Sequence, residues 1–141
     1  DRLGIAVELG THLHIGQSDG DPAVVREALG PDRLLGVSVS SRAELDAIAA
    51  TGCADVVGLS PVWSTTTKTD TAPALGLEGV RELLAARPAG LPAVAIGGIN
   101  ATNAAEVIAT GVDGICVVSA IAAATRPREA AARLKELWEK P

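Results

Sequence analysis

The sequence has 141 residues, enough for one domain with a hydrophobic core. It contains 12 Lys and Arg residues against 17 Asp and Glu residues, so its net charge of −5 does not favour nucleic acid or an anionic membrane as a partner. No apolar run is long enough to cross a bilayer and no signal-peptide pattern occurs, so we expect a cytoplasmic protein.

Small aliphatic side chains must build the core. Hydrophobic residues make up 48% of the sequence, and Trp63 and Trp138 are the only aromatic ones. This composition is typical of parallel sheets that are buried on both faces. Cys53 and Cys116 are too few and too distant in sequence for a zinc site, and their apolar neighbours favour two reduced thiols over a disulfide.

Short apolar strands alternate with helices along the chain. After a helix over residues 2–10, strands are expected over 11–16, 33–38, 54–59, 92–97 and 114–118. Helices are expected between and after them, over 23–29, 41–50, 77–86, 101–110 and 127–140. Boundary residues support this order: Pro22 suits a first helical position, Ser41 and Glu44 have capping-box spacing with Ser40 or Ser41 as the cap, and Asn100 suits a cap.

The repeated strand–helix pattern predicts an α/β fold with a parallel sheet. No Gly-x-Gly-x-x-Gly follows the first strand, which favours a (β/α)8 TIM barrel over a dinucleotide-binding fold. Such barrels usually need about 200 residues or more. We therefore expect residues 1–141 to be a single barrel domain of about five C-terminal βα units, with roughly three N-terminal units missing. The alternative is a self-contained doubly wound sheet of five strands.

We expect the side chains that point into the barrel to be those of Leu13, Val37, Val57, Ala95 and Val117 or their neighbours. The open edges of such an incomplete sheet make a homo-oligomer possible.

A long loop of hydroxyl side chains follows the third expected strand, and Lys68 lies within it. Connections between a strand and a helix usually need about 2–6 residues, so this loop is longer than a connection requires. Hydroxyls donate hydrogen bonds to phosphate oxygens and a lysine adds a positive charge. We interpret the loop as an anion clamp; the alternative is a solvated, threonine-rich surface loop.

Polar residues or glycines also follow the other strands, and in a parallel barrel they would meet at one rim. Gly97 and Gly98 lie just before an expected helix, a pattern that predicts a phosphate site with Val118 and Ser119 beside it. Two turn glycines and a helix cap are the alternative. The remaining residues at this rim are Gln17, Ser18, Asp19 and Ser38.

His12 and His14 are two residues apart and would share one face of a strand. Two histidines could begin a metal site, but only Asp19 lies near enough to be a third ligand. Packed or hydrogen-bonded histidines are therefore the favoured interpretation.

These motifs together resemble the thiamine-phosphate synthase family over the whole chain. The loop containing Thr-x-Thr-Lys is the most specific part of the resemblance, whereas the Gly-Gly turn occurs in many phosphate-binding barrels. The matching segments are residues 1–2, 14–19, 35–38, 57–68, 95–100, 103–107 and 114–121.

The resemblance implies a magnesium-dependent transferase of thiamine biosynthesis. Its substrates would be two small molecules, 4-amino-2-methyl-5-hydroxymethylpyrimidine diphosphate and hydroxyethylthiazole phosphate. It implies Mg2+ as cofactor, held by Asp1 and Asp19, and catalytic roles at the pyrimidine diphosphate for Lys68 and Ser38. Substrate binding, chiefly of the thiazole phosphate, would fall to Thr65, Thr66, Thr67, Gly98, Val118 and Ser119.

Two other functions remain open. A thiazole tautomerase would share the barrel, but its corresponding loop lacks the Thr-x-Thr-Lys form. A non-catalytic phosphate-binding domain of a multifunctional protein would share the phosphate sites. The sequence also departs from the family pattern, because a Gln, an Arg and a Lys that bind the pyrimidine diphosphate have no counterpart in it.

Overall fold

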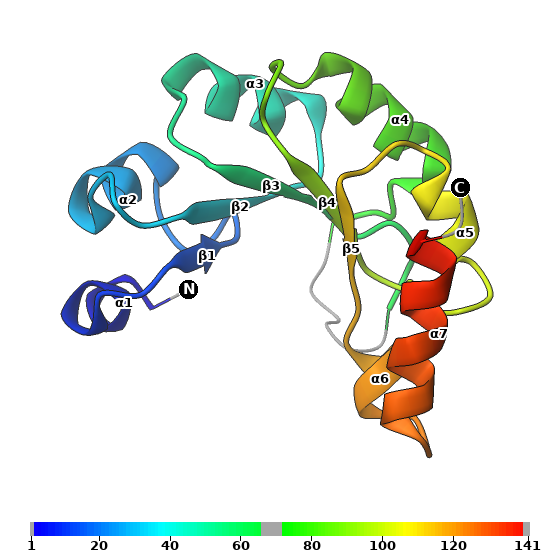
Figure 1. Cartoon of the computed structure of the whole chain (residues 1–141). Coiled ribbons are helices and arrows are strands. Elements are labelled where there is room, and N and C mark those ends of the chain that lie inside the picture. The colour runs from blue at the N-terminus through cyan, green and yellow to red at the C-terminus, as the bar shows by residue number, and fades with distance from the viewer. Residues whose placement is uncertain (1, 66–71, 140–141) are drawn as a thin grey trace.

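The structure is a computed structural model that describes residues 2–65 and 72–139 (Figure 1). Within these residues, five short strands alternate with helices along most of the chain. The strands are β1 (Leu13–Ile15), β2 (Leu35–Val39), β3 (Val56–Leu59), β4 (Ala93–Ile96) and β5 (Gly114–Cys116). The helices are α1 (Leu3–Leu9), α2 (Pro22–Leu29), α3 (Arg42–Thr51), α4 (Gly76–Ala86), α5 (Ala104–Ile108), α6 (Ser119–Ala122) and α7 (Pro127–Glu139).

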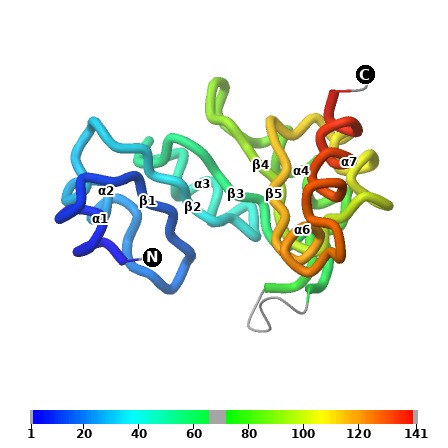
Figure 2. Tube along the Cα trace, turned by 60° about the horizontal axis from the view of Figure 1, so that its bottom comes forward, coloured from blue at the N-terminus to red at the C-terminus, as the bar shows by residue number. Residues whose placement is uncertain are grey.

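All five strands are parallel, and their order in the sheet is their order in the sequence. The sheet is curved, and α2, α3, α4 and α7 lie around its outer side in the two views of Figures 1 and 2. A doubly wound sheet reverses its strand order at a switch point, with helices on both faces. Sequential order with helices on one side is instead the arrangement of a (β/α)8 barrel, so the predicted α/β barrel units are confirmed and the doubly wound alternative is wrong.

The outer face of the sheet forms the core with the helices. Leu35, Val37, Val57 and Ala95 are all fully buried there. Successive strand residues point to opposite faces, so the inner face carries their neighbours. Val37, Val57 and Ala95, named first from the sequence, therefore do not point inward, and their neighbours do: the inner face carries His14, Ser38, Gly58, Val94 and Cys116.

Side-chain caps fix the starts of α2 and α3. Asp21 Oδ1 accepts the backbone N–H of Ala23 at 2.8 Å, and Ser41 Oγ accepts that of Glu44 at 3.3 Å. The return arm of the predicted capping box is displaced by one residue, because the Glu44 carboxylate accepts the N–H of Ser40, at 2.6 Å, instead of that of Ser41. Ser41 is thus the cap, and Ser40 is tied to the same turn.

The helix expected over residues 101–110 is shorter in the structure, where α5 is Ala104–Ile108. Asn103 Oδ1 accepts the N–H of Asn100 at 2.8 Å, and Asn100 Oδ1 accepts that of Thr102 at 2.9 Å. These side chains hold the backbone in a turn and delay the helix. The four-residue helix α6 was not expected, since it is too short to show a periodic pattern.

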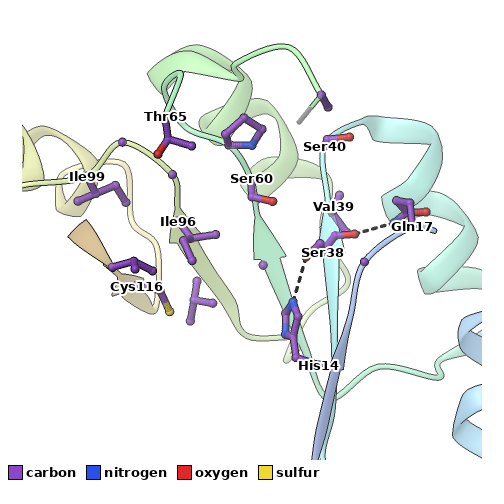
Figure 3. Close-up of a pocket in the computed structure, with 18 of the residues that line it drawn as sticks. His14, Gln17, Ser38, Val39, Ser40, Ser60, Thr65, Ile96, Ile99 and Cys116 are labelled. Carbon is purple, nitrogen blue, oxygen red and sulfur yellow. Dashed lines mark hydrogen bonds between the residues drawn. The ribbon is translucent and has the colours of Figure 1, made fainter. Parts of the chain in front are cut away.

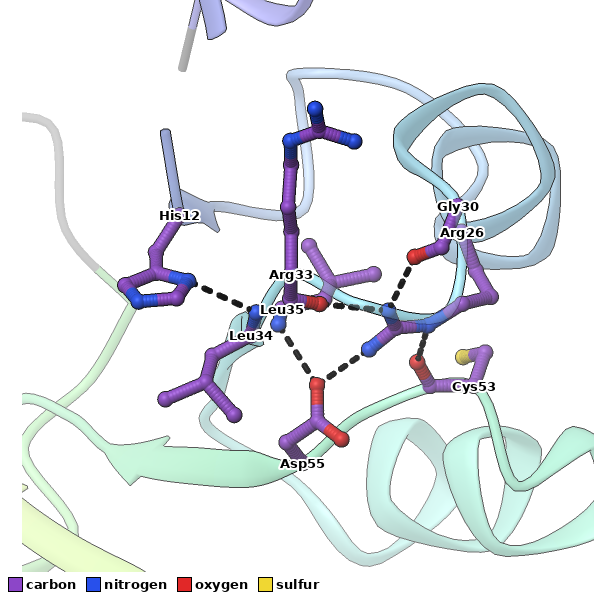
Figure 4. Close-up of polar contacts among 8 residues, drawn as sticks. All are labelled: His12, Arg26, Gly30, Arg33, Leu34, Leu35, Cys53 and Asp55. Carbon is purple, nitrogen blue, oxygen red and sulfur yellow. Dashed lines mark hydrogen bonds and ion pairs between the residues drawn. The ribbon is translucent and has the colours of Figure 1, made fainter. Parts of the chain in front are cut away.

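Arginine–aspartate pairs fasten the amino ends of the strands (Figure 4). Asp55, just before β3, accepts the N–H of Leu35 at 2.7 Å and forms an ion pair with Arg26 of α2. Arg26 also donates to the carbonyl oxygens of Cys53, Gly30 and Arg33 at 2.7–3.0 Å. One guanidinium and one carboxylate thus join α2, β2 and β3.

The same arrangement recurs two strands further on. Asp113, just before β5, accepts the N–H of Ala93 at 2.8 Å and forms an ion pair with Arg87 at the end of α4. These backbone hydrogen bonds, together with Arg87, lower the pKa of Asp113. Beside the first pair, His12 Nδ1 accepts the N–H of Leu34 at 2.9 Å (Figure 4).

No helix among the described residues combines the length and apolar character that crossing a membrane requires.

Candidate active site

A cavity of about 730 Å3 lies on the inner side of the sheet, at the carboxyl ends of the strands (Figure 3). Active sites of (β/α)8 enzymes occupy this end of the strands. The cavity wall brings together five of the residues predicted to act on substrate: Ser38, Thr65, Gly98, Val118 and Ser119.

His14 projects from β1 across the inner face, where Gly36 and Gly58 make room for its ring. A Cβ atom on Gly36 would overlap His14 Nδ1, and one on Gly58 would lie 3.2 Å from His14 Cε1. His14 Nε2 lies 3.0 Å from Ser38 Oγ on the neighbouring strand (Figure 3). The expectation of hydrogen-bonded histidines is thus confirmed for both His12 and His14.

Burial lowers the pKa of His14 below its ordinary value of 6.5. The charged imidazolium is disfavoured in a poorly solvated site. His14 is therefore neutral at pH 7, and it presents one donor and one acceptor nitrogen rather than a cation. Sequence reasoning assigned this residue no role in the reaction, although its position two residues before Gly16 already placed it near the end of β1.

Ser38 is held at its backbone as well as at its side chain. Gln17 Nε2 donates to the Ser38 carbonyl oxygen at 2.6 Å (Figure 3). Two residues after Gln17, Asp19 Oδ2 accepts the N–H of Gly16 at 2.7 Å and closes the turn that follows β1. Gln17 thus links Ser38 to the turn that Asp19 closes.

Gly97 and Gly98 are required by packing. Both have positive φ, 103° and 67°, and a Cβ on Gly97 would lie 2.7 Å from that of Pro61, while one on Gly98 would lie 2.8 Å from that of Trp63. The chain after β3 is hydrogen-bonded here, because the N–H of Trp63 donates to the Gly97 carbonyl at 3.1 Å. Both glycines thus have a structural reason in this turn, whereas the expected cap at Asn100 is wrong, because α5 begins after Asn103 and has no side-chain cap. Both glycines also line the cavity, and their phosphate role stays a prediction.

The threonine-rich loop begins and ends at fixed points. The N–H groups of Leu75 and Gly76 donate to the carbonyl oxygens of Pro61 and Val62, both at 2.9 Å. Thr65 lines the cavity. The other predicted residues of this loop, together with one predicted magnesium ligand, lie outside the described residues: Thr66, Thr67, Lys68 and Asp1. The anion clamp therefore stays a prediction.

Within residues 2–65 and 72–139 there is no group of three or more His, Cys, Asp or Glu side chains that could hold a metal ion. Magnesium is commonly held by only one or two carboxylates together with substrate phosphates. The Asp19 carboxylate at the rim fits that chemistry, because it offers hard oxygen ligands and the turn hydrogen bond from Gly16 fixes one of its oxygens. Its role as a magnesium ligand is a prediction.

Cys116 lies on the inner face, and its thiol points toward the cavity (Figure 3). Partial burial of the thiol raises its pKa, so it stays protonated at neutral pH. A protonated thiol is a poor nucleophile. Besides the Glu44 carboxylate, which Ser40 holds, the cavity combines neutral polar groups on β1 and β2 with apolar groups on β4 and β5, an arrangement suited to binding and positioning rather than to covalent catalysis.

Known proteins resemble this chain in both sequence and structure. The family described as thiamine monophosphate synthase matches residues 1–121. The thiamine biosynthesis multifunctional protein ThiED of Corynebacterium glutamicum is 49% identical over 146 residues, which make up 99% of this chain and 19% of that protein. The thiamine-phosphate synthase of Laribacter hongkongensis is 46% identical over 139 residues, or 98% of this chain and 63% of that protein.

Among solved structures, a thiamine phosphate pyrophosphorylase from Pyrococcus furiosus superposes with a TM-score of 0.86 at 36% sequence identity. The match covers 99% of this chain and 65% of that chain. The chain thus spans less than two thirds of the length of these relatives. By its match over residues 1–121, the chain belongs to the thiamine monophosphate synthase family.

Proposed function

We propose that the protein carrying this sequence is a thiamine-phosphate synthase. The reaction joins 4-amino-2-methyl-5-hydroxymethylpyrimidine diphosphate to hydroxyethylthiazole phosphate and gives thiamine phosphate and diphosphate. The bond between the pyrimidine methylene carbon and the diphosphate oxygen breaks, the diphosphate carries away the bonding electrons, and the thiazole nitrogen forms the new bond to carbon. The observation that carries the proposal is the cavity at the carboxyl ends of the strands, lined by Ser38, Thr65, Gly98, Val118 and Ser119 in a chain of this family.

The described residues can position the two substrates from opposite sides. Ser38, on β2, offers a hydroxyl beside His14 for the pyrimidine diphosphate. Thr65, Gly98 and Ser119 offer a hydroxyl and backbone groups for the thiazole phosphate on the β4 and β5 side. Phosphate sites recur in this fold after its last strands, at a short extra helix like α6. Holding both reactants in one cavity supplies the proximity that this reaction needs.

The departing diphosphate needs its growing charge neutralised. We assign this to Lys68 from its place in the sequence, and to Mg2+ held by Asp19 and Asp1. Magnesium, when bound, would supply Lewis-acid stabilisation of the diphosphate oxygens. Neutral His14 and Ser38 provide hydrogen bonds without adding charge that would compete with a cation.

The proposal is tested with the full-length protein, the two substrates and magnesium, by following thiamine phosphate formation. We expect Lys68→Ala to lower kcat by about 100-fold, the usual effect of losing one contact to developing charge. Arg81→Ala is a suitable control, because Arg81 forms an exposed ion pair with its neighbour Glu78 on α4. An unchanged kcat with only a raised KM for the thiazole phosphate would contradict the role of Lys68.

Binding experiments separate this function from its alternatives. A synthase should bind both substrates and release diphosphate, whereas a phosphate-binding domain would bind thiazole phosphate alone and form no product. Tautomerisation of a thiazole carboxylate phosphate without synthase activity would instead identify the tautomerase.

We also propose a cytoplasmic location, which fits the two free cysteines, Cys53 and Cys116, because thiols persist in reducing compartments.

A further inference from the structure

We infer that Gln17 is a positioning residue of this site, which couples the serine at the pyrimidine diphosphate to the turn carrying the magnesium carboxylate. The inference rests on the proposed function for the roles of Ser38 and Asp19. For the coupling itself it rests on the two hydrogen bonds that join Gln17 and Asp19 to their neighbours.

Gln17 acts where the sheet ladder stops. The last residue of β1, Ile15, pairs with Val37, so β1 ends one residue before it would reach Ser38. The Val39 carbonyl accepts the N–H of Ser60 on the β3 side at 3.0 Å. Carbonyls of successive strand residues point to opposite neighbours, so the Ser38 carbonyl points toward β1, where no strand backbone remains to pair with it. The Gln17 side chain supplies that hydrogen bond at 2.6 Å.

A side chain, not a strand backbone, forms the hydrogen bond to the Ser38 carbonyl, and this affects the shape of the site. A strand continuing along β2 would carry the chain away from the rim, whereas here the chain turns at Gly16 and Asp19 closes the turn. Gln17 therefore anchors the turn and Ser38 to each other by one side chain. Ser38 is held at its carbonyl by Gln17 and at its hydroxyl by His14, so its position depends on both residues of the β1 end.

The chemistry of Gln17 suits this role better than a direct role in the reaction. Its amide carries no charge, so it can lie near a magnesium–diphosphate complex without competing for either partner. Its Nε2 is already donating to the Ser38 carbonyl. Groups that orient metal ligands from behind typically change metal affinity or activity by about 10–100-fold when they are removed.

The test uses Gln17→Met in the full-length protein. Methionine keeps the length and approximate volume of glutamine but has no N–H to donate. We expect about a tenfold rise both in the magnesium concentration for half-maximal activity and in the KM for the pyrimidine diphosphate. The KM for the thiazole phosphate should change less than about twofold, because that substrate is held on the β4 and β5 side.

A second readout does not require turnover. Calorimetric titration with magnesium and inorganic diphosphate should show about a tenfold weaker complex for Gln17→Met than for the wild type. The matched control is Asp21→Ala, which removes the cap of α2 in the same connection between β1 and α2 but does not touch Ser38. Asp21→Ala should lower thermal stability and leave the magnesium requirement unchanged.

The outcomes separate the two proposals. If the wild type forms thiamine phosphate and Gln17→Met matches it in magnesium requirement, in KM and in diphosphate affinity, the inference is wrong and the proposed function stands. If the wild type binds magnesium diphosphate, more weakly in the variant, but forms no product, the proposed function is wrong and the positioning role stands. If Asp21→Ala weakens magnesium diphosphate binding as much as Gln17→Met does, the positioning role of Gln17 is wrong and the residue is only structural. If the wild type does not bind magnesium diphosphate, both the inference and the proposed function are wrong.

Discussion

The two ends of the sheet use polar residues in opposite ways. At the amino ends of the strands, Asp55 and Asp113 are each occupied by a backbone N–H of the preceding strand and by an arginine. At the carboxyl ends, the described polar groups around the cavity are mostly neutral, and the arrangement centred on His14 and Ser38 faces a space large enough for a ligand.

This contrast assigns stability and ligand binding to opposite ends of the same strands. A carboxylate that accepts both a backbone N–H and an arginine fixes the spacing of two strands and a helix. Neutral hydroxyl, amide and imidazole groups contribute less to holding the strands together. They can, however, form hydrogen bonds with charged ligands in the cavity. Substitutions at the two ends should therefore separate stability from activity.

The largest expected effect comes from a residue that breaks the contrast, Gly97 at the carboxyl end. Gly97→Ala places a Cβ 2.7 Å from the Pro61 Cβ at a φ of 103°, so both overpacking and backbone strain oppose it. We expect a loss of about 2–5 kcal/mol in the free energy of unfolding. Urea denaturation followed by circular dichroism measures it, with Gly4→Ala as control, since nothing lies within 4 Å of a Cβ on Gly4. Equal stability of the two variants would contradict the packing argument.

The next largest expected effect is a loss of stability without a loss of catalytic activity. Asp55→Asn removes the charge that faces the half-buried Arg26, and we expect about 1–3 kcal/mol of destabilisation at pH 7. The kcat of the folded protein should not change, because Asp55 lies at the opposite end of the strands from the cavity. Asp46→Asn breaks only an exposed pair with Arg42 and should cost less than about 0.5 kcal/mol. A drop in kcat for Asp55→Asn would show that the two ends are coupled.

The same substitution at the carboxyl end should do the reverse. Asp19→Asn keeps an oxygen that can accept the N–H of Gly16, so the melting temperature should stay within a few degrees of the wild type. The magnesium concentration for half-maximal activity should rise by about tenfold, because a neutral amide is a weaker ligand for Mg2+. A magnesium titration of activity and a thermal melt measure both quantities. Wild-type activity at low magnesium would remove Asp19 from the metal site.

The smallest expected effect is a pH dependence at the amino end. The pKa of Asp113 is lowered from 3.8 by the Ala93 N–H and by Arg87. Stability from this carboxylate is therefore complete above about pH 4 and is lost as the pH falls through the folded-state pKa. Asp113→Asn should flatten the fall of the urea midpoint below about pH 4 relative to the wild type. If the urea midpoints of the two proteins fall in parallel with pH, the Asp113 carboxylate contributes nothing to the loss of stability in acid.

Much of this architecture is readable from the sequence, because strands and helices here carry strong local signals. The order of elements and the barrel-type sheet follow from apolar runs punctuated by residues such as Pro22 and Gly52. The start of α5 does not, because Asn100 and Asn103 can either cap a helix or hold a turn, and only the folded chain decides.

The inner and outer faces of the strands are also hard to tell apart in the sequence, because apolar residues occur on both: Val94 lies on the inner face and Val37 on the outer face. At the site, residue types at strand ends indicate which side chains meet at the rim. They do not indicate which of them touch: the contact between His14 and Ser38 joins residues 24 positions apart. The hydrogen bond of Gln17 depends on the exact point at which β1 stops, and a boundary of that precision is beyond pattern reading.

The sequential strand order also bears on how the chain is made. Each strand from β2 to β5 pairs with the strand that precedes it in the sequence, so these four pairings form between neighbours in the chain. Both amino-end carboxylates reach back 20 residues, from Asp55 to Leu35 and from Asp113 to Ala93, and each one closes a unit on the unit before it. A chain emerging from the ribosome could therefore add one strand and one helix at a time to an existing edge, as repeat proteins do when structure propagates between nearest neighbours.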